Sequence, residues 1–326
     1  MKNTVLQQLE SMTTVVIDSS DLSSIQRFIP LDATTNPSLI TAAAKQSSNL
    51  ELIDQACAQA KQQGYQGDAL IERSLDILTV AFGVEILKII QGRVSTEVDA
   101  NLSYDTEATI NKGLELIELY KGYGISSDRV LIKIASTWQG IQAAKVLEQQ
   151  GIHTNLTLLF NQTQAQACAN AKVTLISPFV GRILDWYKKH EQVDHYPIEQ
   201  DPGVNSVHGI YHLYKSHAIN TQVMAASFRS TAQIIALAGC DLLTIAPNLL
   251  AELAEDQNTI VRALDPTQIV VTQQPLAELS EIEFEQAMQH DAMASELLQS
   301  GINGFIQARQ QLQQILQQRL IADPVS

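Results

Sequence analysis

Residues 128–141 read DRVLIKIASTWQGI, and the run VLIKIA at 130–135 decides the fold class that we expect. Apart from Lys133 this run is aliphatic, and polar residues do not alternate with apolar ones. A strand without such alternation is typical of a parallel sheet that is covered on both faces. Residues 139–150 follow with the apolar spacing of an amphipathic helix. The stretch therefore predicts a buried strand followed by a helix.

The same unit of strand and helix recurs along the chain. Further strands are predicted at 14–18, 32–36, 94–98, 153–158, 173–177, 223–227 and 242–246, and further helices at 37–44, 70–91, 107–120 and 163–171. This alternation predicts an α/β fold in which residues 1–326 form a single parallel (β/α)8 TIM barrel domain. An open doubly wound sheet is the competing fold, but its first strand usually ends in a glycine-rich phosphate turn, and here that turn reads DSSDLSS.

Two segments extend beyond the repeating unit. The first is the longest irregular stretch, at about 185–220, which carries HEQVDHYPIEQDPGVNS and then a helix. We interpret it as an insertion between the sixth and seventh strands. The second is a glutamine-rich C-terminal helix at about 301–321. Its apolar residues recur at helical spacing and predict packing on the barrel exterior or in a dimer interface. They are Ile302, Phe305, Ile306, Leu312, Ile315, Leu316 and Leu320.

Composition and charge exclude several classes of protein. The formal net charge of -14 disfavours binding to nucleic acid or to anionic membranes, which select basic surfaces. The chain has no apolar run long enough for a membrane span and no apolar N-terminal region typical of a signal peptide, so we expect a cytoplasmic protein. Cys57, Cys168 and Cys240 are too few and too scattered for a disulfide framework or a metal cluster.

Polar residues interrupt the apolar strands at or near their carboxyl ends. They are Asp18, Asn36, Glu97, Lys133, Asn155, Thr157, Ser177, Ser227 and Arg229. In a parallel barrel these ends converge on one rim, where catalytic groups collect. Each residue alone could be a turn residue or a satisfied core group. A set drawn from seven strands favours a functional site.

Lys133 is the most informative member of this set. A lysine is rarely buried without a partner, and burial favours the neutral amine that attacks a carbonyl to form a Schiff base. The alternative is a structural ion pair with Glu97, and the residues alone leave both interpretations open. Glu97 and Asp18 could transfer protons in such chemistry, or could be counter-ions only. Asp99 falls past the strand end, where we expect a role in a loop.

Arg182 and Arg229 follow the sixth and seventh predicted strands. Phosphate sites in this fold are built in the later loops, and guanidinium groups bind phosphate well. For Arg182 an ordinary surface position is the alternative. His208 and His212 lie one helical turn apart, but no third ligand accompanies them, so we predict a solvent-facing helix and no metal.

These residues lie in motifs that resemble the transaldolase family over nearly the full length of the chain. The matching stretches are TTVVIDSSD, DATTNPSLI, RVSTEVDANLSYD, DRVLIKIASTWQGI, NLTLLF, LISPFVGRILDWYK, DPGVNSVHGIY, ASFRS and CDLLTIAP. The resemblance implies a circularly permuted class I aldolase barrel, a homodimer and no cofactor. It also implies transfer of a dihydroxyacetone unit between sugar phosphates: sedoheptulose 7-phosphate and glyceraldehyde 3-phosphate become erythrose 4-phosphate and fructose 6-phosphate.

The resemblance also implies roles for individual residues. Lys133 would attack the donor carbonyl, Glu97 would move protons through a water held by Thr157, and Asp18 would take the C4 hydroxyl proton. Asn36, Asn155 and Ser177 would hold donor hydroxyls, and Arg182, Ser227 and Arg229 would bind the phosphate.

Phe179 and Glu97 bear on the choice between two related activities. Fructose 6-phosphate aldolases, which release dihydroxyacetone, carry tyrosine and glutamine at the matching positions, so the resemblance favours transfer over release. That aldolase activity and a barrel without turnover remain the alternatives. A zinc-dependent aldolase would need a set of histidines that the sequence lacks.

Overall fold

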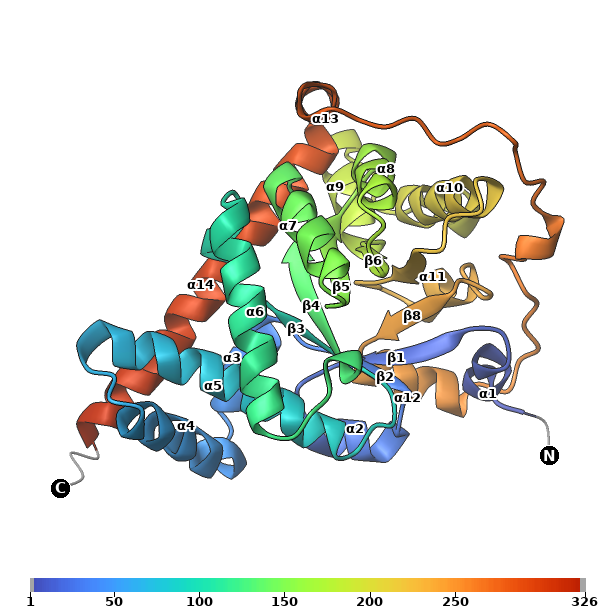
Figure 1. Cartoon of the computed structure of the whole chain (residues 1–326). Helices are drawn as coiled ribbons and strands as arrows, with labels where there is room; N and C mark the ends of the chain where they lie inside the picture. Colours follow the sequence, from blue (N-terminus) through green and yellow to red (C-terminus); the bar gives the residue numbers. More distant parts are fainter. Residues whose placement is uncertain (1–2, 323–326) are drawn as a thin grey trace.

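The computed structural model describes residues 3–322, in which eight parallel strands close into a barrel in the order of the sequence (Figure 1). The predicted (β/α)8 barrel is confirmed, and every predicted strand is present with its ends shifted by no more than two residues. The strands are β1 (Thr14–Asp18), β2 (Asp32–Thr34), β3 (Val94–Glu97), β4 (Val130–Ala135), β5 (Thr154–Leu159), β6 (Leu175–Pro178), β7 (Gln222–Ala225) and β8 (Leu242–Ile245).

Helices surround the barrel on its outer face (Figure 1). They are α1 (Val5–Glu10), α2 (Leu22–Phe28), α3 (Pro37–Ala44), α4 (Leu50–Gln62), α5 (Gly67–Leu87), α6 (Thr106–Gly122), α7 (Trp138–Gln149), α8 (Gln162–Asn170), α9 (Gly181–Glu191), α10 (Pro202–Ser216), α11 (Thr231–Ile235), α12 (Pro247–Glu255), α13 (Glu281–His290) and α14 (Ala292–Ala322). Short 3-10 helices are η1 (Ser47–Asn49), η2 (Ala100–Leu102), η3 (Ser127–Arg129), η4 (Ile198–Gln200) and η5 (Pro266–Gln268).

Strand β4 shows why the aliphatic run points to a barrel. All six of its residues are buried, since the strand faces the surrounding helices on one side and the barrel interior on the other. Ile132 and Ile134 belong to the large core beneath the helices. Leu131 belongs to a separate cluster inside the barrel with residues of β1, β6, β7 and β8. Because side chains alternate along a strand, Lys133 lies on the same inner face as Leu131.

Two segments differ from the sequence-based expectation. The helix predicted in the later part of the stretch at about 185–220 is present as α10, but it begins at Pro202, within the segment expected to be irregular, and α9 continues to Glu191. The Asp201 side chain accepts hydrogen bonds from two backbone amides of the first turn of α10, and proline suits that turn, so DPG is a helix start and not a loop. The C-terminal helix α14 begins at Ala292, well before the predicted start at about 301. The interpretation of residues 185–220 as an insertion stays a prediction.

Glu148, near the end of α7, connects the amino-terminal ends of β5 and β6. Its carboxylate accepts hydrogen bonds from the backbone amides of Thr154 and Thr174 at 2.8 and 2.7 Å, and from both threonine hydroxyls.

We expect Glu148→Ala to destabilise the protein by about 2–4 kcal/mol, because these largely buried donors lose their acceptor. Urea unfolding measures this, with Glu118→Ala as control: Glu118 is 68% exposed and pairs with Lys121. An equal, small effect of both substitutions would contradict the prediction.

Candidate active site

A cavity of about 180 Å³ lies where the carboxyl ends of the strands converge. Nine of the eleven predicted site residues line it: Asp18, Asn36, Lys133, Thr157, Ser177, Phe179, Arg182, Ser227 and Arg229. The other two lie directly beside it, since Glu97 contacts Lys133 and Asn155 contacts Ser177. Topology brings them together, because all eight strands run in the same direction and end at the same rim.

Lys133 lies in the interior of the barrel and is only 5% exposed. Its Nζ donates a hydrogen bond to the Thr35 carbonyl at 3.1 Å and lies 3.4 Å from Glu97 Oε2. Lys133 and Glu97 are register partners on the neighbouring strands β4 and β3, so their side chains enter the barrel side by side. The ion pair considered from the sequence is therefore present. Lys133 also lines the cavity, so its side chain borders space that a ligand can occupy.

Glu97 is a buried carboxyl group, only 9% exposed. Burial raises the pKa of Glu97 to about 7, although the neighbouring charge of Lys133 acts in the opposite direction. Among residues 3–322, neither Glu97 Oε2 nor Thr157 Oγ1 has a hydrogen-bond partner, and both atoms are buried. Such atoms are costly in a folded protein and recur where a ligand or a water binds. A carboxyl group with this pKa can both accept and donate a proton near neutral pH.

Asp18 is a second carboxyl group in the cavity, at the end of β1. Its Oδ1 accepts a hydrogen bond from Thr34 Oγ1 at 2.9 Å, and the Thr34 and Thr244 hydroxyls lie 2.7 Å apart. Burial raises the pKa of Asp18, while the Lys133 charge and the Thr34 hydrogen bond counteract this. The sequence analysis did not identify Thr34 or Thr244 as site residues. Threonine within a β-branched strand carries no signal that separates it from ordinary strand residues.

Amide and hydroxyl groups form a connected set on the floor of the site. Asn155 is fully buried, accepts a hydrogen bond from Ser177 Oγ at 2.6 Å and donates one to Ser95 Oγ at 3.0 Å. Asn36 caps α3 by accepting a hydrogen bond from the Leu39 amide at 3.0 Å. In the described part of the chain no group accepts a hydrogen bond from its side-chain nitrogen, which leaves a donor beside the cavity.

Two arginines lie on one side of the cavity. Arg182 stacks on the Phe179 ring, with its Cζ 4.9 Å from the ring centroid. Burial and the charge of Arg229 lower the pKa of Arg182, and no residue of the range 3–322 accepts a hydrogen bond from its guanidinium. Arg229 is more exposed and pairs with Asp185 at 2.9 Å. A partly buried guanidinium that pairs with no carboxylate in the described part of the chain, next to a second cation, suits an anionic ligand.

Close backbone packing places these arginines together. The Gly181 amide donates a 2.7 Å hydrogen bond to the carbonyl of Ser227, which has a φ of 61° in the left-handed region. A Cβ atom on Gly181 would lie 2.5 Å from that carbonyl oxygen and 2.6 Å from Arg229 Cγ. A glycine is therefore required where α9 begins, directly before Arg182.

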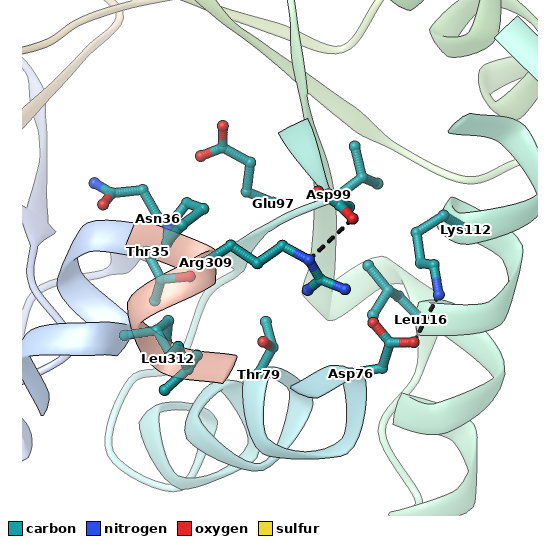
Figure 2. A pocket seen from close by; sticks show the side chains of 13 residues that line it. Thr35, Asn36, Asp76, Thr79, Glu97, Asp99, Lys112, Leu116, Arg309 and Leu312 are labelled. Carbon is teal, nitrogen blue, oxygen red and sulfur yellow. Dashed lines mark hydrogen bonds and ion pairs between the residues drawn. The ribbon is translucent and has the colours of Figure 1, made fainter. Parts of the chain in front are cut away.

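Glu97 lines a second, smaller cavity of about 30 Å³ (Figure 2). Two ion pairs contribute to its wall, Arg309 Nε with Asp99 Oδ2 at 2.9 Å and Lys112 Nζ with Asp76 Oδ2 at 2.6 Å. Asp99 also accepts a hydrogen bond from the Asn101 amide at 2.9 Å, so its expected role in a loop is confirmed. Glu97 and Asn36 both line this smaller cavity, and Asn36 also lines the larger one, so the two cavities are neighbours. Helix α14 contributes Arg309 and Leu312 to the wall.

The C-terminal helix contributes a residue that the sequence analysis assigned only to packing. The predicted apolar positions of α14 do pack on the barrel, where they join the main core or lie against it. Phe305, however, also lines the larger cavity. Figure 1 shows α14 running along one side of the barrel, and it contacts α3, α5 and α9. Helical spacing predicts that the apolar face of α14 is buried, but it does not predict which residues that face contacts.

The two histidines singled out in the sequence lie outside this site. His208 is partly buried and its Nε2 lies 3.0 Å from the Ala236 carbonyl, so only His212 is exposed as predicted. Among residues 3–322, no three His, Cys, Asp or Glu side chains form a group that could hold a metal ion. In the same range no helix has the length and apolar character needed to cross a membrane.

Comparison with known proteins places this geometry in a family. A family model described as Transaldolase/Fructose-6-phosphate aldolase matches residues 15–316. A protein of Trichormus variabilis named Transaldolase is 52% identical over 323 residues, which are 98% of this chain and 97% of that relative. Proteins with the same name from Gloeobacter violaceus and Methylococcus capsulatus are 54% and 50% identical over 323 residues, covering 98% of this chain and 83% and 98% of the relatives.

Proposed function

The chain belongs to the transaldolase/fructose-6-phosphate aldolase family, and from this membership we propose that it is a transaldolase, a transferase of ketol units. Its donors are sedoheptulose 7-phosphate or fructose 6-phosphate, and its acceptors are glyceraldehyde 3-phosphate or erythrose 4-phosphate, as in the pentose phosphate pathway. The observation that carries the proposal is the buried amine of Lys133, 3.4 Å from Glu97, in a cavity that also holds Asp18. No cofactor takes part.

Lys133 serves as the nucleophile in this mechanism. Its neutral amine attacks C2 of the donor, and the resulting carbinolamine loses water to become an imine. Glu97 accepts the amine proton and returns a proton to the departing hydroxyl, through a water next to Thr157. Two buried oxygen atoms that accept no hydrogen bond within residues 3–322, Glu97 Oε2 and Thr157 Oγ1, support that path.

Asp18 acts in the carbon–carbon cleavage. Its carboxylate takes the proton of the C4 hydroxyl while the C3–C4 bond breaks, and the bonding electrons move to the imine nitrogen. The products are an aldehyde, which leaves, and an enamine that stays bound to Lys133. The acceptor aldehyde then enters and the steps reverse. The raised pKa of Asp18 supports this role, because it makes the carboxylate a better proton acceptor.

Neighbouring groups bind the rest of the sugar phosphate. Asn36, Asn155 and Ser177 hold donor hydroxyls, and Ser227 with the two arginines, Arg182 and Arg229, holds the phosphate. The side-chain nitrogen of Asn36 and the guanidinium of Arg182, which donate no hydrogen bond within residues 3–322, support these assignments. The site thereby supplies local positive charge inside a protein whose net charge is -14.

Phe179 supports transfer over release of dihydroxyacetone. It is nearly buried, packs edge-on against Phe160 and carries no proton that could quench the enamine.

We expect glyceraldehyde 3-phosphate to appear continuously from fructose 6-phosphate only when erythrose 4-phosphate is present, as a coupled dehydrogenase assay measures. Comparable release without acceptor would identify a fructose 6-phosphate aldolase. Absence of release under both conditions would favour a barrel without turnover.

We also propose that residues 1–326 form one domain and that the protein is a cytoplasmic homodimer. The resemblance to the family supports both the assembly and the compartment. Light scattering of the purified protein tests the assembly, and a monomeric mass would contradict it.

A further inference from the structure

One face of α14 lies directly beside Arg182. Gly301, Phe305 and Arg309 are spaced four residues apart, so they share one face of the helix. A Cβ atom on Gly301 would lie 2.5 Å from Leu158 Cδ2 and 3.2 Å from Arg182 Nη1. The backbone of α14 therefore approaches the Arg182 guanidinium closely, and glycine allows this approach.

Arg182 lies between two aromatic rings. Its Cζ is 4.9 Å from the ring centroid of Phe179 and 5.9 Å from that of Phe305. Both distances are within the range of cation–π contacts. In the part of the chain that the structure describes, no carboxylate pairs with Arg182 and no acceptor bonds its guanidinium. The rings therefore restrict its orientation while its hydrogen-bond donors stay available for a ligand.

The next turn of α14 anchors the helix to the barrel. Arg309 pairs with Asp99, which follows β3, at 2.9 Å (Figure 2). It also pairs with Glu72 of α5. These contacts hold Phe305 in place, because it lies one turn before the anchored residue on the same face. Phe305 is 4% exposed and lines the cavity, so its ring has little freedom to move away from Arg182.

We propose that Phe305 is a positioning residue that orients Arg182 for the substrate phosphate, so that α14 sets the preference for phosphorylated over unphosphorylated sugars. The proposal rests on the proposed function and adds a residue outside the strands and loops of the barrel. Phe305 acts through Arg182 and needs no contact with the reacting carbons.

The test compares fructose 6-phosphate with fructose as donors, with erythrose 4-phosphate as acceptor. We expect Phe305→Leu to lower the ratio of the two kcat/KM values about 3- to 10-fold, mainly through KM for the phosphorylated donor. Phe305→Met, which keeps most of the side-chain volume but no ring, should lower the ratio similarly and guards against a folding defect. In an Arg182→Gln background, Phe305→Leu should cause no further change in the ratio.

Phe284→Leu is the matched control. Phe284 of α13 is also 4% exposed, packs on Trp138 and does not line the cavity, so the ratio should not change. Equal losses on both donors in Phe305→Leu would overturn the proposal. If Arg182→Gln leaves the ratio unchanged, the phosphate site itself is wrong and the proposal falls with it. A wild-type protein without transfer activity would instead contradict the proposed function.

Discussion

Replacing Lys133 with alanine should abolish covalent capture of the donor and lower turnover by at least about 10⁴-fold. Incubation of the wild-type protein with fructose 6-phosphate and borohydride should reduce the imine and leave a three-carbon adduct. Peptide mapping by mass spectrometry should place this adduct on Lys133. The effect is large because the amine forms the covalent bond that stores the transferred unit between the half-reactions. Among the described residues that line the cavity, Lys133 alone carries an amine, since the other cations are Arg182 and Arg229.

The same substitution should leave the protein folded. Loss of the Lys133 charge removes the interaction that counteracts the raised pKa of Glu97, so Glu97 becomes protonated and avoids a buried unpaired charge. Lys112→Ala is a suitable control, because Lys112 is also largely buried and pairs with Asp76 and Glu115 outside the substrate cavity. This control should still form the adduct. An adduct on a different lysine, or one formed by Lys133→Ala, would disprove the assignment.

Replacing Glu97 with glutamine should lower kcat about 10²- to 10⁴-fold, the range expected when a positioned proton-transfer group is lost. The pH profile gives a sharper readout. Glu97 has a pKa raised to about 7 by burial, and only its charged form can accept the proton of the attacking amine. Wild-type kcat/KM should therefore fall as the pH drops below about 7. This inflection should be missing from the residual activity of Glu97→Gln.

The carboxyl group of Asp18 should also affect the pH dependence of kcat/KM. Asp18 also has a raised pKa, so an acidic limb that remains in Glu97→Gln should lie at a different pH. Glu115→Gln serves as control because Glu115 pairs with Lys112 and Arg73 away from the cavity. It should keep both the rate and the inflection. An inflection near pH 7 that persists in Glu97→Gln would exclude Glu97 as its source.

The barrel and most of its rim residues could be predicted because their signals are local. A strand covered on both faces needs aliphatic residues at nearly every position, and β4 meets this need except at Lys133. A polar residue in such a run is conspicuous in the sequence. Parallel topology then brings Asp18, Glu97 and Lys133 to the same rim. Their closeness follows from strand direction alone, although their roles in the reaction remain proposals.

Other features depended on contacts between distant parts of the chain. The hydrogen bond between Thr34 and Thr244 joins residues 210 positions apart, and nothing in either strand marks its partner. Phe305 has the spacing of a packing residue, yet it reaches the cavity and Arg182. Hydrophobic periodicity reports whether a side chain is covered, because burial depends on the local pattern. The residues that a buried side chain contacts depend on how whole helices and strands pack together. These contacts are defined only in the closed barrel with α14 packed against its side.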